Sequence, residues 1–266
     1  MQTPEPEADV PLLEVSQLSY QYPGGLPALD CVSIDVRVGE SLGIVGPSGA
    51  GKSTLLQHLN GLLPNPSTKD QDQPSCVRVA ELNATRGNLA RIRQMVGLMF
   101  QDPDDQLFCS SVWDDVAFGP RNLNLASAAV NQRVRESLRA VGLEELGNRS
   151  VLQLSFGERK RVCLAGVLAC RPQVLALDEP SANLDPRSRR QLMSIIADFP
   201  GTRIVATHDL DLVARLCRRV IVLDSGRVCA DGLATDILSD ESLMLAHGLE
   251  VPLSLGGGGM DADHGP

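Results

Sequence analysis

The stretch of sequence that decides the fold is Gly46-Pro47-Ser48-Gly49-Ala50-Gly51-Lys52-Ser53-Thr54. It matches the pattern G-x-x-x-x-G-K-[ST], whose glycines let main-chain N–H groups close around phosphate oxygens. The short apolar run 42–45 precedes it and residues 53–63 have a helical pattern, so we predict a strand, a phosphate-binding loop and a helix. In such a loop Lys52 reaches the β- and γ-phosphates of a nucleotide and Ser53 binds Mg²⁺.

A second stretch, 174–179, is an apolar run that ends in two acids. Ligands of open α/β sheets bind at the carboxyl edge of the strands, where this run would place both carboxylates. Asp178 is then the expected partner of Mg²⁺, and Glu179 the group that polarises an attacking water. Taken alone, the same residues also fit a strand that ends in a solvated turn. The loop at Gly46 favours the nucleotide-binding interpretation.

The remaining chain predicts an α/β fold. Residues 12–36 alternate apolar and polar side chains around a Pro-Gly-Gly turn, which indicates antiparallel strands, and 95–100 is a candidate buried strand. From residue 173 onward strands and helices alternate, which is typical of a mainly parallel sheet covered by helices. The further elements that we predict are a surface excursion at 64–74, helices at 127–146, 187–199 and 210–217, strands at 174–177 and 204–207, and a hairpin around 224–226.

Composition restricts the classes of partner. The 266 residues carry a formal net charge of −9, which disfavours a nucleic-acid partner because binding of a phosphate backbone needs clustered Lys and Arg. The seven cysteines include no C-x-x-C pair, as a reducing compartment permits. The N-terminus lacks the pattern of a secretion signal, and no run is long and apolar enough to span a membrane, so we expect a cytosolic protein.

At this point the sequence resembles a known family, the ABC ATPases, over nearly the whole folded chain. The supporting motifs follow in the family's order: Gln101, then Leu154-Ser155-Phe156-Gly157-Glu158, which is similar to the family's LSGGQ stretch, then Asp185 and His208. Tyr22 is similar to the aromatic residue that stacks on adenine, with Tyr20 as the alternative.

The resemblance implies a P-loop ATPase fold, with a mixed central sheet, an antiparallel β subdomain and a helical subdomain. Residues 11–252 would form one ABC ATPase domain with the helical subdomain at about 102–165, flanked by a disordered N-terminus, 1–10, and a disordered glycine-rich tail, 253–266. ATP and Mg²⁺ are the implied cofactors.

The resemblance also implies roles for single residues. Gln101 would touch Mg²⁺ and the attacking water, His208 would contact the γ-phosphate, and Asp185 would be the acid of the loop that follows Glu179. In the family two ATP molecules lie between two subunits, and each is capped by the other subunit's counterpart of Ser155, Phe156 and Gly157. The sequence departs from the family pattern at Phe156, which replaces a glycine, and at Glu158, which replaces a glutamine.

The segment 96–108, VGLMFQDPDDQLF, resembles the ATPase subunits of energy-coupling factor transporters, which import vitamins and transition-metal ions such as cobalt and nickel. The implied partners are a second ABC ATPase subunit, a transmembrane coupling protein and a small substrate-binding membrane protein, and the implied location is the cytoplasmic face of the membrane. Asp102, Asp104 and Asp105 are then candidates to accept hydrogen bonds from arginines of the coupling protein.

Two other interpretations remain open. A soluble ABC ATPase that remodels a macromolecule would share the same nucleotide site, although no sustained heptads interrupt this chain and its charge points away from nucleic acid. A subunit that binds ATP without hydrolysing it is favoured only by Phe156 and Glu158. The identity of the transported substrate and the choice between a homodimer and a heterodimer are not encoded in these motifs.

Overall fold

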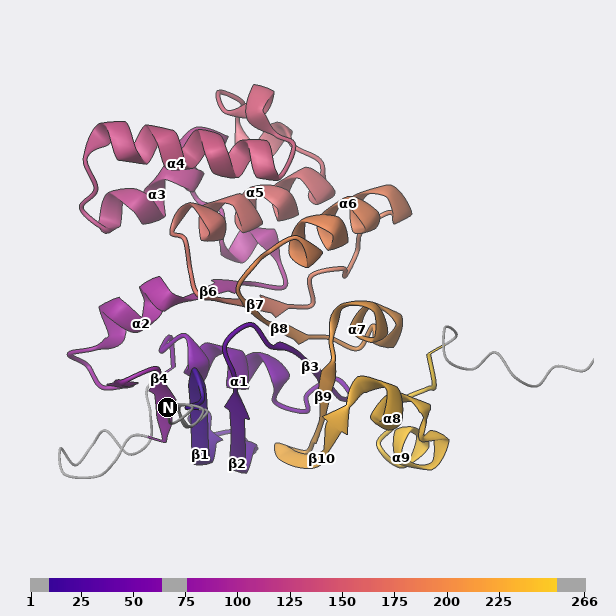
Figure 1. Cartoon of the computed structure of the whole chain (residues 1–266). Helices are drawn as coiled ribbons and strands as arrows, with labels where there is room; N and C mark the ends of the chain where they lie inside the picture. The colour runs from indigo at the N-terminus through magenta and orange to yellow at the C-terminus, as the bar shows by residue number, and fades with distance from the viewer. Residues whose placement is uncertain (1–9, 64–75, 253–266) are drawn as a thin grey trace, which may run out of the picture.

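The computed structural model describes residues 10–63 and 76–252. Its elements, in chain order, are β1 (Leu13–Gln21), β2 (Pro27–Val36), β3 (Ser41–Val45), α1 (Lys52–Leu59), β4 (Val77–Val79), β5 (Leu82–Asn83), α2 (Leu89–Met95), β6 (Val96–Met99), η2 (Pro103–Asp105), α3 (Val112–Asn122), α4 (Ser127–Ala140), η3 (Glu144–Leu146), η4 (Val151–Gln153), α5 (Phe156–Ala169), β7 (Val174–Asp178), α6 (Pro186–Ala197), β8 (Thr202–Ala206), α7 (Leu210–Leu216), β9 (Arg219–Asp224), β10 (Arg227–Leu233), α8 (Ala234–Ser239) and α9 (Glu241–Ala246) (Figure 1). The excursion predicted at 64–74, the tail 253–266 and all of the predicted N-terminal segment except Val10 lie outside the described residues.

A six-stranded sheet with the order β10-β9-β3-β8-β7-β6 forms the centre of the molecule. Its strands are parallel except for β10, which pairs antiparallel with β9 through the predicted hairpin. Ser225 and Gly226 at its tip both have positive φ, as a two-residue hairpin turn requires. Strands β3 and β7 are buried at every residue, so both faces of the sheet are covered. The mixed sheet expected from the sequence is confirmed.

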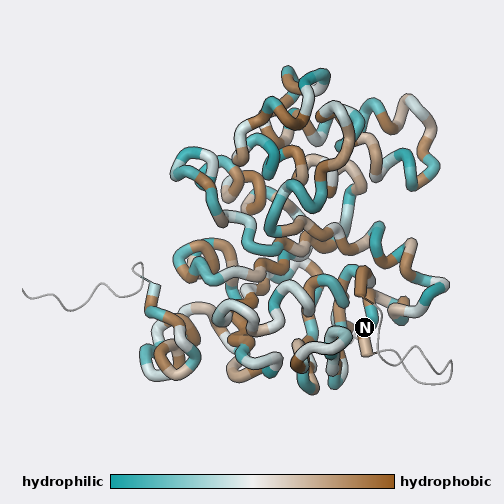
Figure 2. Tube along the Cα trace, turned by 180° about the vertical axis from the view of Figure 1, so that it is seen from behind, coloured by the Kyte–Doolittle hydropathy of each residue, from teal (hydrophilic) through white to brown (hydrophobic). Residues whose placement is uncertain are grey.

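The second sheet is antiparallel, with the order β2-β1-β4-β5, and confirms the strands predicted at 12–36. Helix α1 packs against strands of both sheets, and the side chains between them form one of two hydrophobic clusters. In Figure 2 the hydrophobic colouring concentrates along the strands in the middle of the molecule. This packing fixes the helix that begins in the phosphate-binding loop.

Helices α3, α4 and α5 pack on one another above the sheet in Figure 1. Four side chains predicted to share a face of α4 are buried in the second cluster: Val130, Val134, Leu138 and Val141. The helix ends at Ala140, earlier than the predicted residue 146, because Gly142 adopts a left-handed φ of 68°. Helix α1 likewise ends at Leu59 and not at 63, since Gly61 has a φ of 72°. No helix within the described residues is long and apolar enough to cross a membrane.

Candidate functional site

The loop formed by residues 46–54 follows β3 and opens α1, as the sequence predicted. Two of its glycines are required by the backbone and by their neighbours. A Cβ at Gly46 would lie 1.9 Å from the main-chain oxygen of Leu223, and one at Gly51 would lie 2.4 Å from that of Ala28. Gly51 also has a φ of 103°, which L side chains rarely adopt. The main chain therefore closes tightly around the N-terminus of α1, whose N–H groups favour an anion.

Lys52 is buried beneath this loop. Its ammonium donates to the carbonyl oxygens of Gly46 at 2.7 Å and Pro47 at 3.0 Å. Burial lowers the pKa of Lys52, while the carboxylates of Glu179 and Asp178 act in the opposite direction. A phosphate that entered the loop would offer the ammonium stronger, charged acceptors than these two carbonyls.

Asp178 ends β7 behind the loop and is 6% exposed. Burial raises the pKa of its carboxyl group, and a hydrogen bond from Ser53 lowers it. Its Oδ1 atom is buried and has no hydrogen-bond partner among the described residues. Because a buried carboxylate oxygen without a partner is costly, this atom fits a role as ligand of a cation that Ser53 also reaches.

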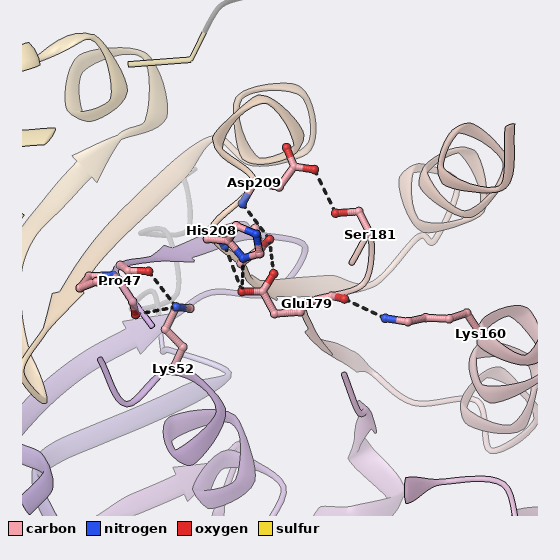
Figure 3. A network of polar contacts seen from close by, with 9 residues as sticks. Pro47, Lys52, Lys160, Glu179, Ser181, His208 and Asp209 are labelled. Atoms are coloured by element: carbon pink, nitrogen blue, oxygen red, sulfur yellow. Dashed lines mark hydrogen bonds and ion pairs between the residues drawn. The ribbon is translucent and has the colours of Figure 1, made fainter. Parts of the chain in front are cut away.

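Glu179 follows directly, and its carboxylate points toward His208 (Figure 3). Its backbone is left-handed, with a φ of 43°. Its Oε1 accepts hydrogen bonds from the main-chain N–H of His208 at 3.1 Å and lies 2.8 Å from the Nδ1 of the same residue, and its Oε2 accepts from the hydroxyl of Thr207 at 2.7 Å. The ends of β7 and β8 thus bring the predicted catalytic acid, Glu179, into direct contact with His208, the predicted ligand of the γ-phosphate.

Tyr22 lies just after β1, with 40% of its surface exposed. Its hydroxyl is 3.3 Å from the Oγ1 of Thr54, and its ring packs edge-to-face on Tyr20. Tyr20 packs in turn on His58 of α1, beside the core. Of the two tyrosines that the sequence offered, the cleft is lined by Tyr22.

A cleft of about 1150 Å³ unites these groups. It is lined by Tyr22, the loop 46–54, Gln101, Glu179 and His208, together with 26–28, 209–211 and 248–252. Five predicted site residues do not line it: Asp178, which is buried directly behind the phosphate-binding loop, and Ser155, Phe156, Gly157 and Asp185. One subunit therefore brings together the phosphate-binding and catalytic candidates and leaves the LSGGQ-like residues elsewhere.

Ser155 is the N-cap of α5, in a reciprocal arrangement with Glu158. The hydroxyl of Ser155 accepts from the N–H of Glu158 at 3.3 Å, and Glu158 accepts from the N–H and the hydroxyl of Ser155, both at 2.8 Å. These hydrogen bonds from Ser155 lower the pKa of Glu158. The acid that replaces the family's glutamine completes a capping box at the start of the helix.

Phe156 and Gly157, the next two residues, differ in their surroundings. The Phe156 ring is half-buried, with its centroid 5.7 Å from the guanidinium carbon of Arg159 and 5.9 Å from the ammonium of Lys160. A Cβ at Gly157 would lie 2.5 Å from the hydroxyl of Ser188 on α6. Close packing of α5 on α6 explains why this glycine is needed.

Asp185 is the N-cap of α6 and accepts hydrogen bonds from the N–H groups of Arg187 at 2.9 Å and Ser188 at 3.1 Å. Hydrogen bonds from the hydroxyl of Ser188 and from the N–H groups of Ser188 and Arg187 lower the pKa of the Asp185 carboxyl group. The predicted loop acid is therefore already engaged in capping a helix.

The three acids after Gln101 are all exposed, and two of them make contacts within the chain. Asp102 caps the short helix η2 by accepting from the N–H of Asp104 at 2.9 Å. Asp104 forms an ion pair with Arg159 of α5, but its side chain remains 64% exposed, so its contact with an arginine of a membrane protein stays a prediction. Asp105 remains exposed. The pairing escaped the sequence analysis because the two residues are far apart in the chain.

A second groove, of about 420 Å³, lies between this segment, β6 and the helices α3 and α5. Phe108 and Phe118, which are 66% and 45% exposed, pack edge-to-face at its rim, with ring centroids 4.7 Å apart. Gln106 crosses its base, accepting from the N–H of Phe100 and donating to the oxygen of Cys163, both at 3.1 Å. Large exposed aromatic side chains beside a groove are typical of a protein-binding surface.

Several residues at these sites were not predicted. Thr207 precedes the predicted His208, but its role as a donor depends on the strand ends that meet there. Gln106 lies inside the segment 96–108 without a signal of its own, Lys160 lies two residues after the LSGGQ-like stretch, and the wall 248–252 belongs to a chain segment with no recognisable pattern.

Comparisons with known proteins agree with this geometry. The model of a family described as ABC transporter matches residues 29–182. The chain is 43% identical over 246 residues to the cobalt import ATP-binding protein CbiO of Rhodobacter capsulatus, covering 91% of this chain and 86% of that protein. It is 40% identical over 244 residues to the energy-coupling factor transporter ATP-binding protein EcfA of Methanothermobacter thermautotrophicus, covering 91% and 77%.

Among solved structures, the chain is similar to cbiO1 of Clostridium perfringens, described as part of the ABC transporter complex cbiONQ. The TM-score is 0.74 and the sequence identity 36%, over 89% of this chain and 94% of that one.

Proposed function

Because the chain belongs to the ABC transporter family of ATP-binding subunits, and within it to the energy-coupling factor and CbiO type, we propose that it hydrolyses ATP to drive uptake of a transition-metal ion or a vitamin. The chain is thus an ATPase of an importer complex. The observation that carries the proposal is the single cleft in which Lys52, Glu179 and His208 meet. Two relatives, named as a cobalt import protein and an energy-coupling factor subunit, favour a transition-metal ion or a vitamin as the transported substrate.

The loop 46–54 binds the phosphates of ATP, and Tyr22 stacks on the base. Lys52 leaves the carbonyls of Gly46 and Pro47 and turns its ammonium toward the β- and γ-phosphates. The open side of the cleft near Tyr22 gives the ring access to a planar base.

Mg²⁺ would be held by Ser53 and by the free Oδ1 of Asp178, with Gln101 at the edge of the same cleft. When bound, the ion would neutralise negative charge on the phosphates. Few protein ligands suffice, because phosphates and water supply the remaining positions of a magnesium site.

Glu179 is the general base that removes a proton from the attacking water. In this structure Oε1 contacts the N–H and Nδ1 of His208, and Oε2 accepts one hydrogen bond from Thr207, which leaves Oε2 able to accept a second from a water. His208, whose side chain is 69% exposed, then turns to the γ-phosphate. Before a nucleotide binds, the contact with His208 holds the Glu179 carboxylate in place.

A second subunit completes the site. Ser155, Phe156 and Gly157 lie outside the cleft of their own chain, and the N-terminus of α5 can face a phosphate only in another subunit. Two subunits would close around two ATP molecules, and hydrolysis would let them part.

Replacement of Glu179 by Gln tests both roles. General-base catalysis contributes on the order of 10²–10⁴ to rate, so Glu179→Gln is expected to slow hydrolysis by about that factor while ATP still closes the dimer. Size-exclusion chromatography in saturating Mg-ATP measures this. A variant that stays monomeric, at an ATP concentration where binding is demonstrated, contradicts the closure of two subunits.

The groove beneath Phe108 and Phe118 binds a cytoplasmic helix of the membrane coupling protein. The two exposed rings supply apolar contact, and the exposed carboxylate of Asp105 beside them suits an arginine on that helix. The protein would therefore lie on the cytoplasmic face of the membrane, as a peripheral subunit beside a substrate-binding membrane protein.

Purification of the tagged chain from detergent-solubilised native membranes tests this assembly. We expect a transmembrane coupling protein and a small membrane subunit to copurify, and the ligand bound to the small subunit to identify the cargo. Recovery of soluble or nucleoprotein partners alone would leave the ATPase intact and refute the importer. Phe108→Asp should abolish copurification while ATP binding persists, since Phe108 lies outside the cleft.

A further inference from the structure

The main chain of Glu179 is held at three points. Its N–H donates to the oxygen of Ala206 at 2.8 Å, and its own oxygen accepts from the N–H of Ala182 at 3.2 Å and from the ammonium of Lys160 at 2.8 Å. These contacts surround a residue whose φ of 43° lies in the left-handed region. A non-glycine residue keeps such a conformation only where its surroundings impose it, and the direction of the Glu179 side chain depends on it.

Lys160 is the unusual member of this set, because it is a fully buried lysine. It projects from α5 toward the end of β7, and Figure 3 shows its ammonium meeting the Glu179 main chain from the helix side. Burying an ammonium is costly unless it makes hydrogen bonds. The face of Phe156, 5.9 Å away, supplies a further favourable contact. A leucine or methionine would fill the same space without this cost, so packing alone does not explain a lysine here.

We propose that Lys160 is a positioning residue for ATP hydrolysis: it fixes the left-handed peptide of Glu179 through the main-chain oxygen and so aims the carboxylate. The inference rests on the proposed role of Glu179 as general base. Helix α5 would then carry both Ser155, at its start, which caps the partner's nucleotide, and Lys160, which orients the general base Glu179 of its own subunit. A displacement of α5 is therefore transmitted to Glu179 through a single hydrogen bond.

Lys160→Met tests the proposal, because it keeps the unbranched length of the side chain and removes the donor. Small misplacements of a catalytic group cost up to about 10²-fold, so we expect kcat of the full chain to fall by roughly 10- to 100-fold. The KM and the Kd for ATP should stay within about twofold, since Lys160 does not line the cleft. Lys160→Gln retains a donor and should recover part of kcat; it also carries the test if the methionine variant does not fold.

Arg133→Met is the matched control. Arg133 donates to the oxygens of Ala169 and Cys170 at 3.3 and 3.4 Å, so it too joins a cation to main-chain carbonyls, at the opposite end of α5. This variant should lose stability without a comparable loss of kcat. Equal losses of kcat in both variants would overturn the proposal, because they would show a general effect on the helix.

The double variant Lys160→Met, Glu179→Gln tests whether the effect passes through Glu179. If it does, single-turnover hydrolysis by the double variant should be no slower than by Glu179→Gln alone. A multiplicative loss would contradict the proposal, as would an unchanged kcat in Lys160→Met. Full activity of Glu179→Gln has a different meaning: it would refute the general base itself.

Discussion

The N-termini of α1 and α5, to which the proposed function assigns phosphate, are built in opposite ways. Helix α1 begins after Gly51, which has no side chain, so its first N–H groups are left open toward the cleft. Helix α5 begins after Ser155, and its first turn is closed by a capping box that brings the carboxylate of Glu158 to the same place. An anion binds readily to the first terminus. At the second it must approach an acid that the helix itself holds.

These opposite constructions suit different roles for the two ends in the proposed cycle. In the proposed dimer the α1 end would hold phosphate within one subunit, whereas the α5 end would meet it only when two subunits close. A weaker, negatively charged terminus favours a contact that forms and breaks during each cycle.

Subunit mixing is the strongest test of this division. Lys52→Met disables the α1 end and Ser155→Arg the α5 end, and each alone should lower hydrolysis by on the order of 10²-fold or more. In a mixed dimer one site combines an intact loop with an intact α5, so an equal mixture should recover roughly a quarter of the wild-type sites. ATPase measurements on the mixture decide the matter. Activity no higher than the mean of the two variants would place both ends in the same subunit's site.

Acid should affect helix α1, through a histidine in its last turn, before it affects the α5 end. His58 of α1 is 2% exposed, its Nε2 is buried without a partner among the described residues, and burial lowers its pKa to about 4. A lowered pKa means that the unfolded chain binds the proton more readily, so this contribution is complete above about pH 6.5 and is lost as pH falls toward 4. Over this pH range the protein loses about 3 kcal/mol of unfolding free energy.

His58→Phe retains a ring against Tyr20 and removes the titration. Urea unfolding at about pH 7 and about pH 4.5 should give a smaller difference in free energy for this variant than for the wild type. Equal differences in the free energy of unfolding would show that His58 does not account for the loss of stability in acid.

How much of this could be read from the sequence follows the same division. The loop 46–54, the strand before it and the two acids after β7 form local patterns, and the structure confirms the strands and the sheet that position them. Contacts across the chain were out of reach. Asp104 pairs with Arg159 across 55 residues and Lys160 reaches Glu179 across 19, and no spacing rule connects residues that only tertiary packing brings together.

Gly157 tests the packing of the α5 end. In Gly157→Ala the new Cβ would lie 2.5 Å from the hydroxyl and 2.8 Å from the Cβ of Ser188, so α5 and α6 must separate. Overpacking of this kind costs about 1–3 kcal/mol. We expect this cost to lower the thermal unfolding temperature and also to weaken ATP-dependent dimer formation. Ser188→Gly removes both atoms and should rescue the alanine variant in part; absence of rescue would assign the loss to another contact.

The smallest expected effect is also the most direct comparison of the two termini. Glu158→Gln keeps an acceptor for the N–H of Ser155, so the capping box survives and only the charge is lost. Because hydrogen bonds from Ser155 lower the pKa of Glu158, its contribution to stability is present above the unfolded pKa and disappears as pH falls through the folded pKa. The charged form interacts with the helix dipole by about 0.3–1 kcal/mol, discounted here by exposure, so near neutral pH the variant should be less stable by no more than a few tenths of a kcal/mol, and in acid by nothing. The ATP-bound dimer should respond in the opposite direction, since removal of a negative charge makes the α5 end more like the α1 end and more favourable to phosphate. A dimer no tighter than the wild type, at equal ATP, would mean that the carboxylate of Glu158 does not face the nucleotide.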